Sequence, residues 1–239
     1  MSIKLRKFKK TGADRVMALY ELPLAKYMPD ARTHIDPQTI GEVDMHWAAV
    51  THPGARFPAL GTEGLASCMG LAVHNTATRA TGLAHLAQEG PTLDLAGESR
   101  HSLIAMLNQV CAQGGRIQAR IVGPTSGGPM VARMVDQVAE VLKEYDVEVM
   151  SADFSTKPGT LRQFAVHSGF WEQGLIRGRY SMAELMNASA HGGEKAIEKL
   201  QAQAVNLDKM VPLRSPTPES LLYNGLTETT GLEHYPGMD

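Results

Sequence analysis

Two residues of this chain, Cys68 and His85, combine a nucleophile with a proton-transfer group at a spacing that can bring them together. They are almost equally distant from a short polar segment, residues 75–80, and the stretches on both sides of it alternate as β-strands do. An antiparallel hairpin would oppose the thiol and the imidazole, because directly opposed Cβ atoms are about 4.5–5.5 Å apart. The spacing therefore predicts a cysteine nucleophile activated by a histidine.

A purely structural role is the alternative for both residues. A free cysteine commonly packs as a small hydrophobic residue, and a buried histidine commonly completes a hydrogen-bond network. A hairpin register shifted by one residue would also send the two side chains to opposite faces of the sheet. Spacing alone leaves both interpretations open.

A longer pattern surrounds Cys68. The run Thr-x-Gly-Leu-x-Ser-Cys occupies residues 62–68, and Gly-Leu-Ala-His occupies residues 82–85, with the histidine seventeen positions after the cysteine. This combination resembles the signature of the chemoreceptor glutamine deamidases, the CheD family, in which a threonine also falls six positions before the cysteine. Deamidase toxins of the cytotoxic-necrotizing-factor type and bacterial lethal-factor deamidases look like more distant relatives.

The resemblance implies a hydrolase that converts glutamine side chains of a protein to glutamate and releases ammonia, without a cofactor or a metal. Cys68 would attack the amide, His85 would transfer protons, and Thr62 would hydrogen-bond the imidazole. Small residues before the nucleophile, Gly64 and Ser67 among them, suit an oxyanion site built from backbone N–H groups.

A glycine-rich loop at residues 123–129 follows an expected strand at 116–122 and precedes an expected helix at about 131–145. It lacks the Gly-Lys-Ser/Thr ending of a P-loop, and the chain has no dinucleotide-binding GxGxxG pattern. In the CheD-like comparison a similar loop follows a strand at this place. The resemblance therefore implies that Gly127 and Gly128 help to wall the substrate cleft.

Composition narrows the class of protein. The chain has 239 residues, of which 43% are hydrophobic and 20% charged, and a net charge of −2, so no general attraction to nucleic acid is expected. No apolar run is long enough for membrane insertion, and the basic first ten residues lack the apolar core of a secretory signal. The two cysteines, Cys68 and Cys111, exclude a disulfide framework and favour a reducing, cytoplasmic setting.

The remaining histidines give no metal-ligand pattern. His46 and His52 are six residues apart, and no Cys/His/carboxylate cluster supports a zinc site. His46 falls on the polar positions of an alternating run at 42–48, which predicts one half-buried strand. Solvent exposure is expected for His46 and His52, and for His74 and the other histidines outside the motif.

The order of expected elements is several strands, a helix, a strand, a helix and then further strands, which predicts an α/β or α+β sandwich with two helices covering mixed sheets. The resemblance covers residues 42–179 and implies the α/β/β sandwich of the CheD-like fold. We expect an N-terminal arm and surface segment at 1–41, a catalytic domain at 42–181, and a helical extension with a flexible tail at 182–239. A helix is expected from Glu194 to Lys209.

The substrate is less constrained than the chemistry, because the chain extends beyond the resemblance at both ends. A bacterial chemoreceptor is the leading candidate, and a host protein attacked by a delivered, secreted effector is an alternative. A non-catalytic adaptor that binds a chemotaxis regulatory protein is another, since CheD-like proteins also resemble adaptors. A thiol–imidazole pair could also hydrolyse an ester or transfer an acyl group.

Overall fold

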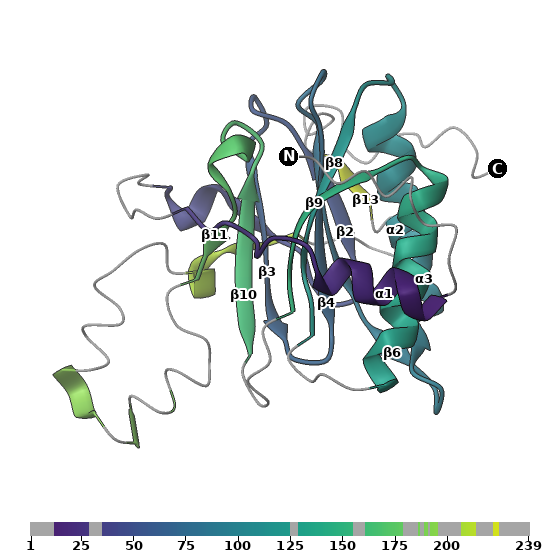
Figure 1. Ribbon diagram of the computed structural model, residues 1–239. Helices are drawn as coiled ribbons and strands as arrows, with labels where there is room; N and C mark the ends of the chain where they lie inside the picture. Colours follow the sequence, from purple (N-terminus) through teal and green to yellow (C-terminus); the bar gives the residue numbers. More distant parts are fainter. Residues whose placement is uncertain are drawn as a thin grey trace.

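Two β-sheets lie face to face, and helices cover the outer face of the larger sheet (Figure 1). The computed structural model describes residues 12–28, 35–124, 129–154, 161–178, 186, 189–190, 192–195, 207–213 and 222–224. Within this part of the chain the architecture is mixed α/β, with three layers in the order helices, sheet, sheet.

The larger sheet has six strands, and its centre is the hairpin expected around Cys68 and His85. Its two hairpin strands are buried along their whole length, because helices cover one face and the second sheet covers the other. The strand order is β13 (Leu222–Asn224), β2 (Ala48–Thr51), β5 (Thr81–Leu86), β4 (Met69–Asn75), β8 (Ile117–Val122) and β9 (Glu148–Asp153). β8 and β9 are parallel, and β4 pairs antiparallel with both β5 and β8.

The smaller sheet has five strands and supplies the opposite wall of the sandwich. Its order is β11 (Ile176–Arg177), β10 (Arg162–His167), β3 (Ala59–Leu65), β1 (Ile40–Glu42) and β12 (Val211–Pro212). The two sheets approach closely where Gly70 of β4 faces Phe164 of β10, since a Cβ atom at position 70 would collide with the phenyl ring. A separate pair, β6 (Gln88–Glu89) and β7 (Asp94–Leu95), follows β5.

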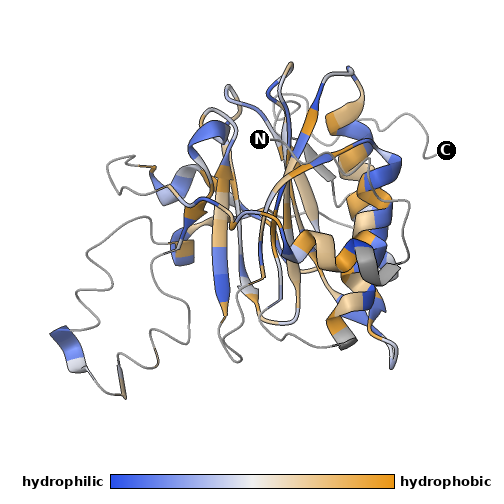
Figure 2. Cartoon of the chain, in the orientation of Figure 1, coloured by the Kyte–Doolittle hydropathy of each residue, from blue (hydrophilic) through white to orange (hydrophobic). Residues whose placement is uncertain are grey.

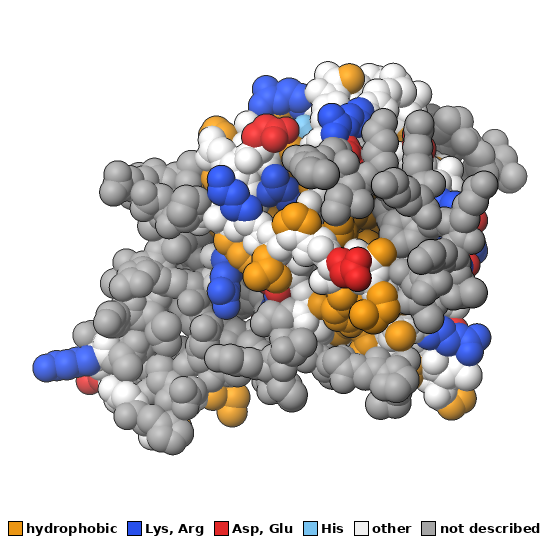
Figure 3. All heavy atoms as spheres, viewed as in Figure 1, with side chains coloured by type: hydrophobic (Ala, Val, Ile, Leu, Met, Phe, Trp, Pro, Cys, Tyr) orange, Lys and Arg blue, Asp and Glu red, His pale blue; other side chains and the backbone are white. Residues whose placement is uncertain are grey.

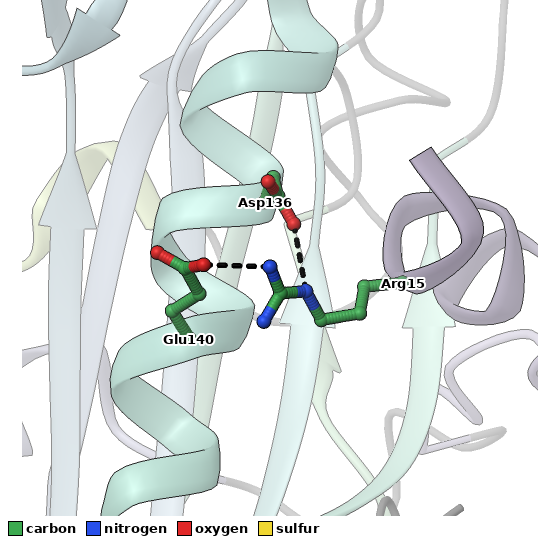
Figure 4. A network of polar contacts seen from close by, with 3 residues as sticks. All are labelled: Arg15, Asp136 and Glu140. Carbon is green, nitrogen blue, oxygen red and sulfur yellow. Dashed lines mark hydrogen bonds and ion pairs between the residues drawn. The ribbon is translucent and has the colours of Figure 1, made fainter. Parts of the chain in front are cut away.

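Three α-helices belong to the outer layer: α1 (Gly12–Tyr20), α2 (Gly97–Cys111) and α3 (Pro129–Glu144). Hydrophobic residues run along the central strands and the helix faces turned to them (Figure 2). α1 packs beside α3, and Arg15 pairs with Asp136 at 3.1 Å and Glu140 at 2.6 Å (Figure 4). Short 3₁₀ turns occur at Pro37–Thr39, Trp171–Gln173 and Leu207–Lys209.

The single strand expected at residues 42–48 is wrong. The chain leaves the smaller sheet after Glu42, makes a turn at residues 45–46, and enters the larger sheet at Ala48. Val43 precedes the turn and Trp47 follows it, and both pack into the space between the sheets. Their alternation with polar residues therefore resembles that of a single strand. The next strand, β3, begins at Ala59 and continues to Leu65, so it includes Thr62.

Segments on both sides of the expected central domain contribute to the core. Val16 and Leu19 of α1 are buried in the outer layer, and Leu207 and Met210 are buried beside β1 and β10. Of the helix expected from Glu194 to Lys209, residues 194–195 are helical and residues 207–209 form a 3₁₀ turn, whereas residues 196–206 lie outside the described part. Among the described residues, no helix is both long and apolar enough to cross a membrane.

Figure 3 shows hydrophobic side chains gathered on the part of the viewed face that α1 crosses. Met17, Tyr20 and Leu24 contribute exposed apolar surface there, with 58%, 39% and 73% of their surfaces accessible. The Tyr20 ring also packs on Phe154, with 4.4 Å between the ring centroids, so it joins α1 to the end of β9.

Candidate active site

Thr62, Cys68 and His85 are brought to one end of the sandwich from three different strands or strand ends. Thr62 lies in β3 of the smaller sheet, His85 lies in β5 of the larger sheet, and Cys68 directly precedes β4. All three are buried, with exposed fractions of 0%, 8% and 4% in chain order. The candidate site therefore lies between the sheets and depends on their packing.

The register of the hairpin differs from the predicted one by two residues. Gly70, and not Cys68, is directly opposite His85. A shift of two keeps the thiol and the imidazole on the same face, because side chains in a strand alternate with a period of two. Such diagonal neighbours lie about 7–8 Å apart. The predicted direct opposition is thus wrong, while the predicted shared face is retained.

The imidazole of His85 bonds to Thr62 across the gap between the sheets. Its Nδ1 atom lies 2.8 Å from Thr62 Oγ1. Its Nε2 atom is buried and has no hydrogen-bond partner in the described part of the protein. One ring nitrogen is thus fixed by the threonine and the other remains available for proton transfer.

Burial favours the uncharged forms of both candidate catalytic groups. Burial lowers the pKa of His85 to about 4; the Asp44 carboxylate opposes this shift and His46 adds to it. Burial also raises the pKa of the Cys68 thiol, and a hydrogen bond with the Ser67 side chain opposes the increase. At neutral pH the free protein therefore holds a neutral imidazole near a neutral thiol, and not a preformed thiolate–imidazolium pair.

The turn that crosses between the sheets holds the backbone of His85 on both sides. The N–H of His46 donates to the carbonyl of His85 at 2.9 Å, and the N–H of His85 donates to the carbonyl of Trp47 at 2.9 Å. His46 has φ = 70°, a left-handed conformation that is uncommon outside glycine. This turn was invisible in the alternating pattern that predicted a strand.

Two buried serines of α2 support this turn. Ser99 Oγ lies 3.0 Å from His46 Nδ1 and accepts the N–H of Ala87 at 2.9 Å. Ser102 Oγ donates to the carbonyl of His46 at 2.7 Å. Contrary to the sequence expectation, His46 is half-buried. In the sequence, the only sign of these contacts is that both serines fall on the apolar side of the helix. The sequence does not reveal which groups they bind.

The other expected site residues have different places. Gly64 and Ser67 are exposed, and Gly64 has φ = +71°, a backbone conformation that suits glycine. Thr62 and Cys68, at the two ends of the same motif, are buried instead. Gly127 and Gly128 lie outside the described residues.

The start of the glycine-rich loop is tethered to the smaller sheet by Arg162. Its Nη1 donates to the carbonyls of Gly123 at 2.9 Å and Asp153 at 2.7 Å, and its Nη2 forms an ion pair with the Asp153 carboxylate. Tyr27 donates its hydroxyl to the same carboxylate at 2.9 Å. Arg162 is opposite Leu65 of β3, so this network lies at the same end of the sandwich as Thr62.

Acidic side chains gather on the outer face of the smaller sheet, on the opposite side from Thr62. Burial, followed by the neighbouring Asp208 carboxylate, raises the pKa of Glu63. Burial and the charges of Glu63 and Asp44 likewise raise the pKa of Glu42. The side-chain amide of Gln163 donates to both Glu63 and Asp208 and partly relieves this repulsion. This acidic cluster therefore lies behind the strand that carries Thr62, and not in the space between the sheets.

The chain shares sequence similarity with a protein of described activity. The chain is 27% identical over 129 residues to a protein of Archaeoglobus fulgidus described as a probable chemoreceptor glutamine deamidase CheD, covering 48% of this chain and 82% of that protein. No family model matches the chain. The similarity supports a CheD-like relationship over about half of the sequence.

Two solved structures share weak likeness with the fold. The Bacillus licheniformis hypothetical protein YfiH has a TM-score of 0.33 and 10% identity, covering 70% of this chain and 74% of its own. YlmD from Geobacillus stearothermophilus has a TM-score of 0.28 and 14% identity, covering 69% and 78% respectively. At such low TM-scores neither likeness assigns a fold to this chain.

Proposed function

We propose that this protein is a cysteine-dependent deamidase that hydrolyses the side-chain amide of glutamine residues in a protein substrate. The observation that carries the proposal is the buried Thr62–His85 hydrogen bond with Cys68 on the same face, in a chain similar to a probable chemoreceptor glutamine deamidase. Each residue type has a defined role in amide hydrolysis: a nucleophile, a proton carrier and a group that orients the carrier.

The first half-reaction forms a thioester. The neutral His85 ring accepts the thiol proton at Nε2 as Cys68 Sγ bonds to the amide carbon. The tetrahedral intermediate then loses its C–N bond, and the same proton passes from the imidazolium to the departing nitrogen, which leaves as ammonia. The C–S bond remains, so the products of this step are ammonia and the acyl-enzyme.

The second half-reaction restores the thiol. His85 removes a proton from water as the hydroxyl oxygen attacks the thioester carbon, and the C–S bond breaks with return of the proton to sulfur. The substrate side chain is then glutamate. In this scheme Thr62 Oγ1 accepts the Nδ1 proton of His85, which leaves the Nε2 lone pair free to act as a base.

At neutral pH the His85 ring is unprotonated, so a lone pair is available to accept a proton, while its lowered pKa of about 4 makes it a weaker base than a solvent-exposed histidine. The buried Nε2 atom, which has no hydrogen-bond partner among the described residues, is the acceptor that the first step needs. We assign the oxyanion site to backbone N–H groups near Ser67 and Cys68, and a wall of the substrate cleft to Gly127 and Gly128. The chemistry uses only these side chains, the peptide backbone and water.

The substrate class follows from similarity. A chemoreceptor is the leading candidate because of the described activity of the relative.

Intact and peptide mass spectrometry of chemoreceptor cytoplasmic domains, with parallel assay of ammonia, tests the proposal. Wild-type protein should convert glutamine to glutamate with one ammonia per site, and Cys68→Ala should abolish both signals. Cys111→Ala is the matched control and should retain them. An ester substrate and an amine acceptor, assayed alongside, separate deamidation from ester hydrolysis and acyl transfer.

The adaptor hypothesis makes the opposite prediction. An adaptor retains its binding partner and its cellular effect when Cys68 is replaced by alanine, whereas a deamidase loses its effect. Glutamine-bearing host proteins in the same mass-spectrometric assay test the effector alternative. Conversion that persists in Cys68→Ala, or no conversion of any substrate by a folded wild-type protein, contradicts the proposed function.

A further inference from the structure

A hollow lies at the opposite end of the sandwich from Cys68. It is a cavity of about 250 Å³ whose lining includes His74, Arg79, Phe170, Trp171 and Glu172. His74 is near the end of β4, whereas Cys68 precedes the start of the same strand, so the two ends are roughly 20 Å apart. The cavity is thus separate from the candidate active site.

An aromatic and imidazole wall forms one side of this cavity. The rings of His74 and Trp171 are stacked, with 5.0 Å between centroids and an interplanar angle of 10°. Trp171 donates its indole N–H to Gln118 Oε1 at 2.8 Å, which fixes the ring against β8. The wall is held by contacts between the two sheets and does not depend on a ligand.

A buried guanidinium lies against this wall. The central carbon of the Arg120 guanidinium is 4.8 Å from the centroid of the Trp171 ring. Arg120 is 8% exposed, and its Nε and Nη1 atoms have no hydrogen-bond partner in the described part of the protein. Burial lowers the pKa of Arg120, and the charge of Glu172 opposes this shift. A buried cation that forms no ion pair within the described residues is costly, and such a charge attracts an anion through the low-dielectric interior.

A second guanidinium lies at the cavity itself. Arg79 has φ = 62° and lines the hollow, and its Nη2 atom donates to the carbonyl of Gly169 at 2.9 Å. Glu172, which is exposed, is the only acidic residue among the described lining residues. The two guanidinium groups therefore outnumber the one carboxylate, and the hollow is electropositive.

The two imidazoles near the cavity are held in their neutral forms. Burial lowers the pKa of His74 to about 4, with further lowering by Arg79 and Arg120. Burial and Arg79 also lower the pKa of His167, whose Nδ1 accepts the N–H of Gly169 at 2.9 Å. At neutral pH both rings are therefore uncharged. The positive charge near the cavity comes from the two arginines, and a bound anion would compensate it.

We propose that this cavity binds a small oxyanion, a phosphate or carboxylate group, with Arg79 as its direct ligand and Arg120 as a buried countercharge. Arginine is the side chain suited to such groups because its planar N–H fork matches their oxygens. The volume is at the lower end for ligand sites, so the ligand is a small molecule and not a peptide segment. Phe170 and Trp171 provide an apolar surface beside the charged group.

Trp171 provides a direct readout of binding. The chain has two tryptophans, so Trp47→Phe leaves Trp171 as the only indole emitter. Titration of that full-length protein with inorganic phosphate, and separately with benzoate, should give a saturable fluorescence change, whereas sodium chloride at matched ionic strength should not. Comparison of the two probes identifies the preferred oxyanion.

Variants distinguish a specific anion-binding site from non-specific attraction by surface charge. Arg79→Gln should weaken binding about tenfold or more, because it removes a charge-assisted hydrogen bond. Arg100→Gln, on the exposed side of α2, is the control and should leave the affinity unchanged. Arg120→Met should weaken binding and remove ligand-induced thermal stabilisation, while Arg120→Lys should retain part of both.

A saturable signal that Arg79→Gln and Arg120→Met leave unchanged would overturn the proposal, as would a folded protein that responds to neither probe beyond the sodium chloride control. If Arg120→Met does not fold, Arg79→Gln and Arg120→Lys decide the matter with the same titration. No measurement in this set involves deamidation, so its outcome is independent of the function proposed for Cys68.

Discussion

The same side-chain pair occurs at both ends of the sandwich, in different surroundings. The Nδ1 atom of His85 lies 2.8 Å from Thr62 Oγ1, and the Nδ1 atom of His74 lies 2.8 Å from Thr81 Oγ1. Burial lowers the pKa of each imidazole to about 4. A hydrogen-bonded histidine and threonine with a depressed pKa are therefore not enough to define a catalytic site.

The two histidines differ in the groups that surround the rest of the imidazole ring. The Nε2 atom of His85 is buried and has no hydrogen-bond partner within the described ranges, and Cys68 lies on the same face of the sheet. His74 instead stacks on Trp171, and two guanidinium groups lower its pKa further. A nucleophile gives the first pair its proposed chemistry, whereas an aromatic partner makes the second a wall of a cavity.

Replacing each histidine tests this distinction most directly. We expect His85→Gln to reduce the rate of ammonia release about 10²-fold or more, because it removes the proposed proton carrier. We expect the rate of His74→Gln to stay within about twofold of the wild-type rate, since His74 is roughly 20 Å from Cys68. Initial rates on a chemoreceptor fragment, with thermal unfolding to verify folding, check both. Similar losses in the two variants would contradict the assignment.

The two threonines provide a finer comparison. Thr62→Val removes the hydroxyl that fixes His85, and we expect kcat to fall about fivefold to tenfold with little change in KM. Thr81→Val removes the equivalent hydroxyl at the other end and should leave both constants unchanged. Steady-state kinetics of the pair measures the difference, and recovery of kcat in Thr62→Ser identifies the hydroxyl as the active feature.

Acid should destabilise the protein through both histidines. An unfolded histidine binds a proton near pH 6.5, whereas His74 and His85 do so in the folded protein only near pH 4. Their contribution to stability is therefore complete above pH 6.5 and declines as the pH falls toward 4. His74→Phe should reduce the stability lost between pH 7.5 and pH 5 by about 1–2 kcal/mol, as measured by urea unfolding. An unchanged pH dependence would show that His74 titrates normally.

We expect the smallest difference between the alkylation rates of the two cysteines, Cys68 and Cys111. Burial raises the pKa of both Cys68 and Cys111, and His85 is neutral at neutral pH. In the free protein we therefore expect iodoacetamide labelling of Cys68 to increase steadily from pH 6 to pH 9. Peptide mass spectrometry follows both thiols in one sample. A plateau of fast Cys68 labelling at mildly acidic pH would reveal a preformed ion pair.

The central hairpin could be predicted from sequence because its signals are local. Alternating small and apolar residues flank a polar segment, and the turn at residues 76–78 falls within the expected segment 75–80. The helix over 129–144 likewise agrees with the one expected at about 131–145. The register could not be fixed in this way, because the side chains of the turn and the second sheet decide which residues align.

The contacts that shape the site are between segments far apart in the chain. Nothing near His74 indicates its stacking on Trp171, so its expected exposure is wrong and its observed exposure is 5%. The turn through His46 resembled a continuous strand because both halves are alternating and half-buried. Only the resemblance to a known family suggested that Thr62 and His85 meet, since they belong to different sheets.

The pairing of β1 with β12 has a consequence for the order in which the protein folds. Gly41 aligns with Val211, so the smaller sheet is complete only when residues from nearly opposite ends of the described chain have met. Closing such a long loop is slow, and it follows the formation of the local hairpin. A nascent chain that has emerged only as far as β11 carries Thr62, Cys68 and His85 but lacks the strand that completes the sheet holding Thr62. Late assembly of this kind delays completion of the candidate site until β12 has been synthesised.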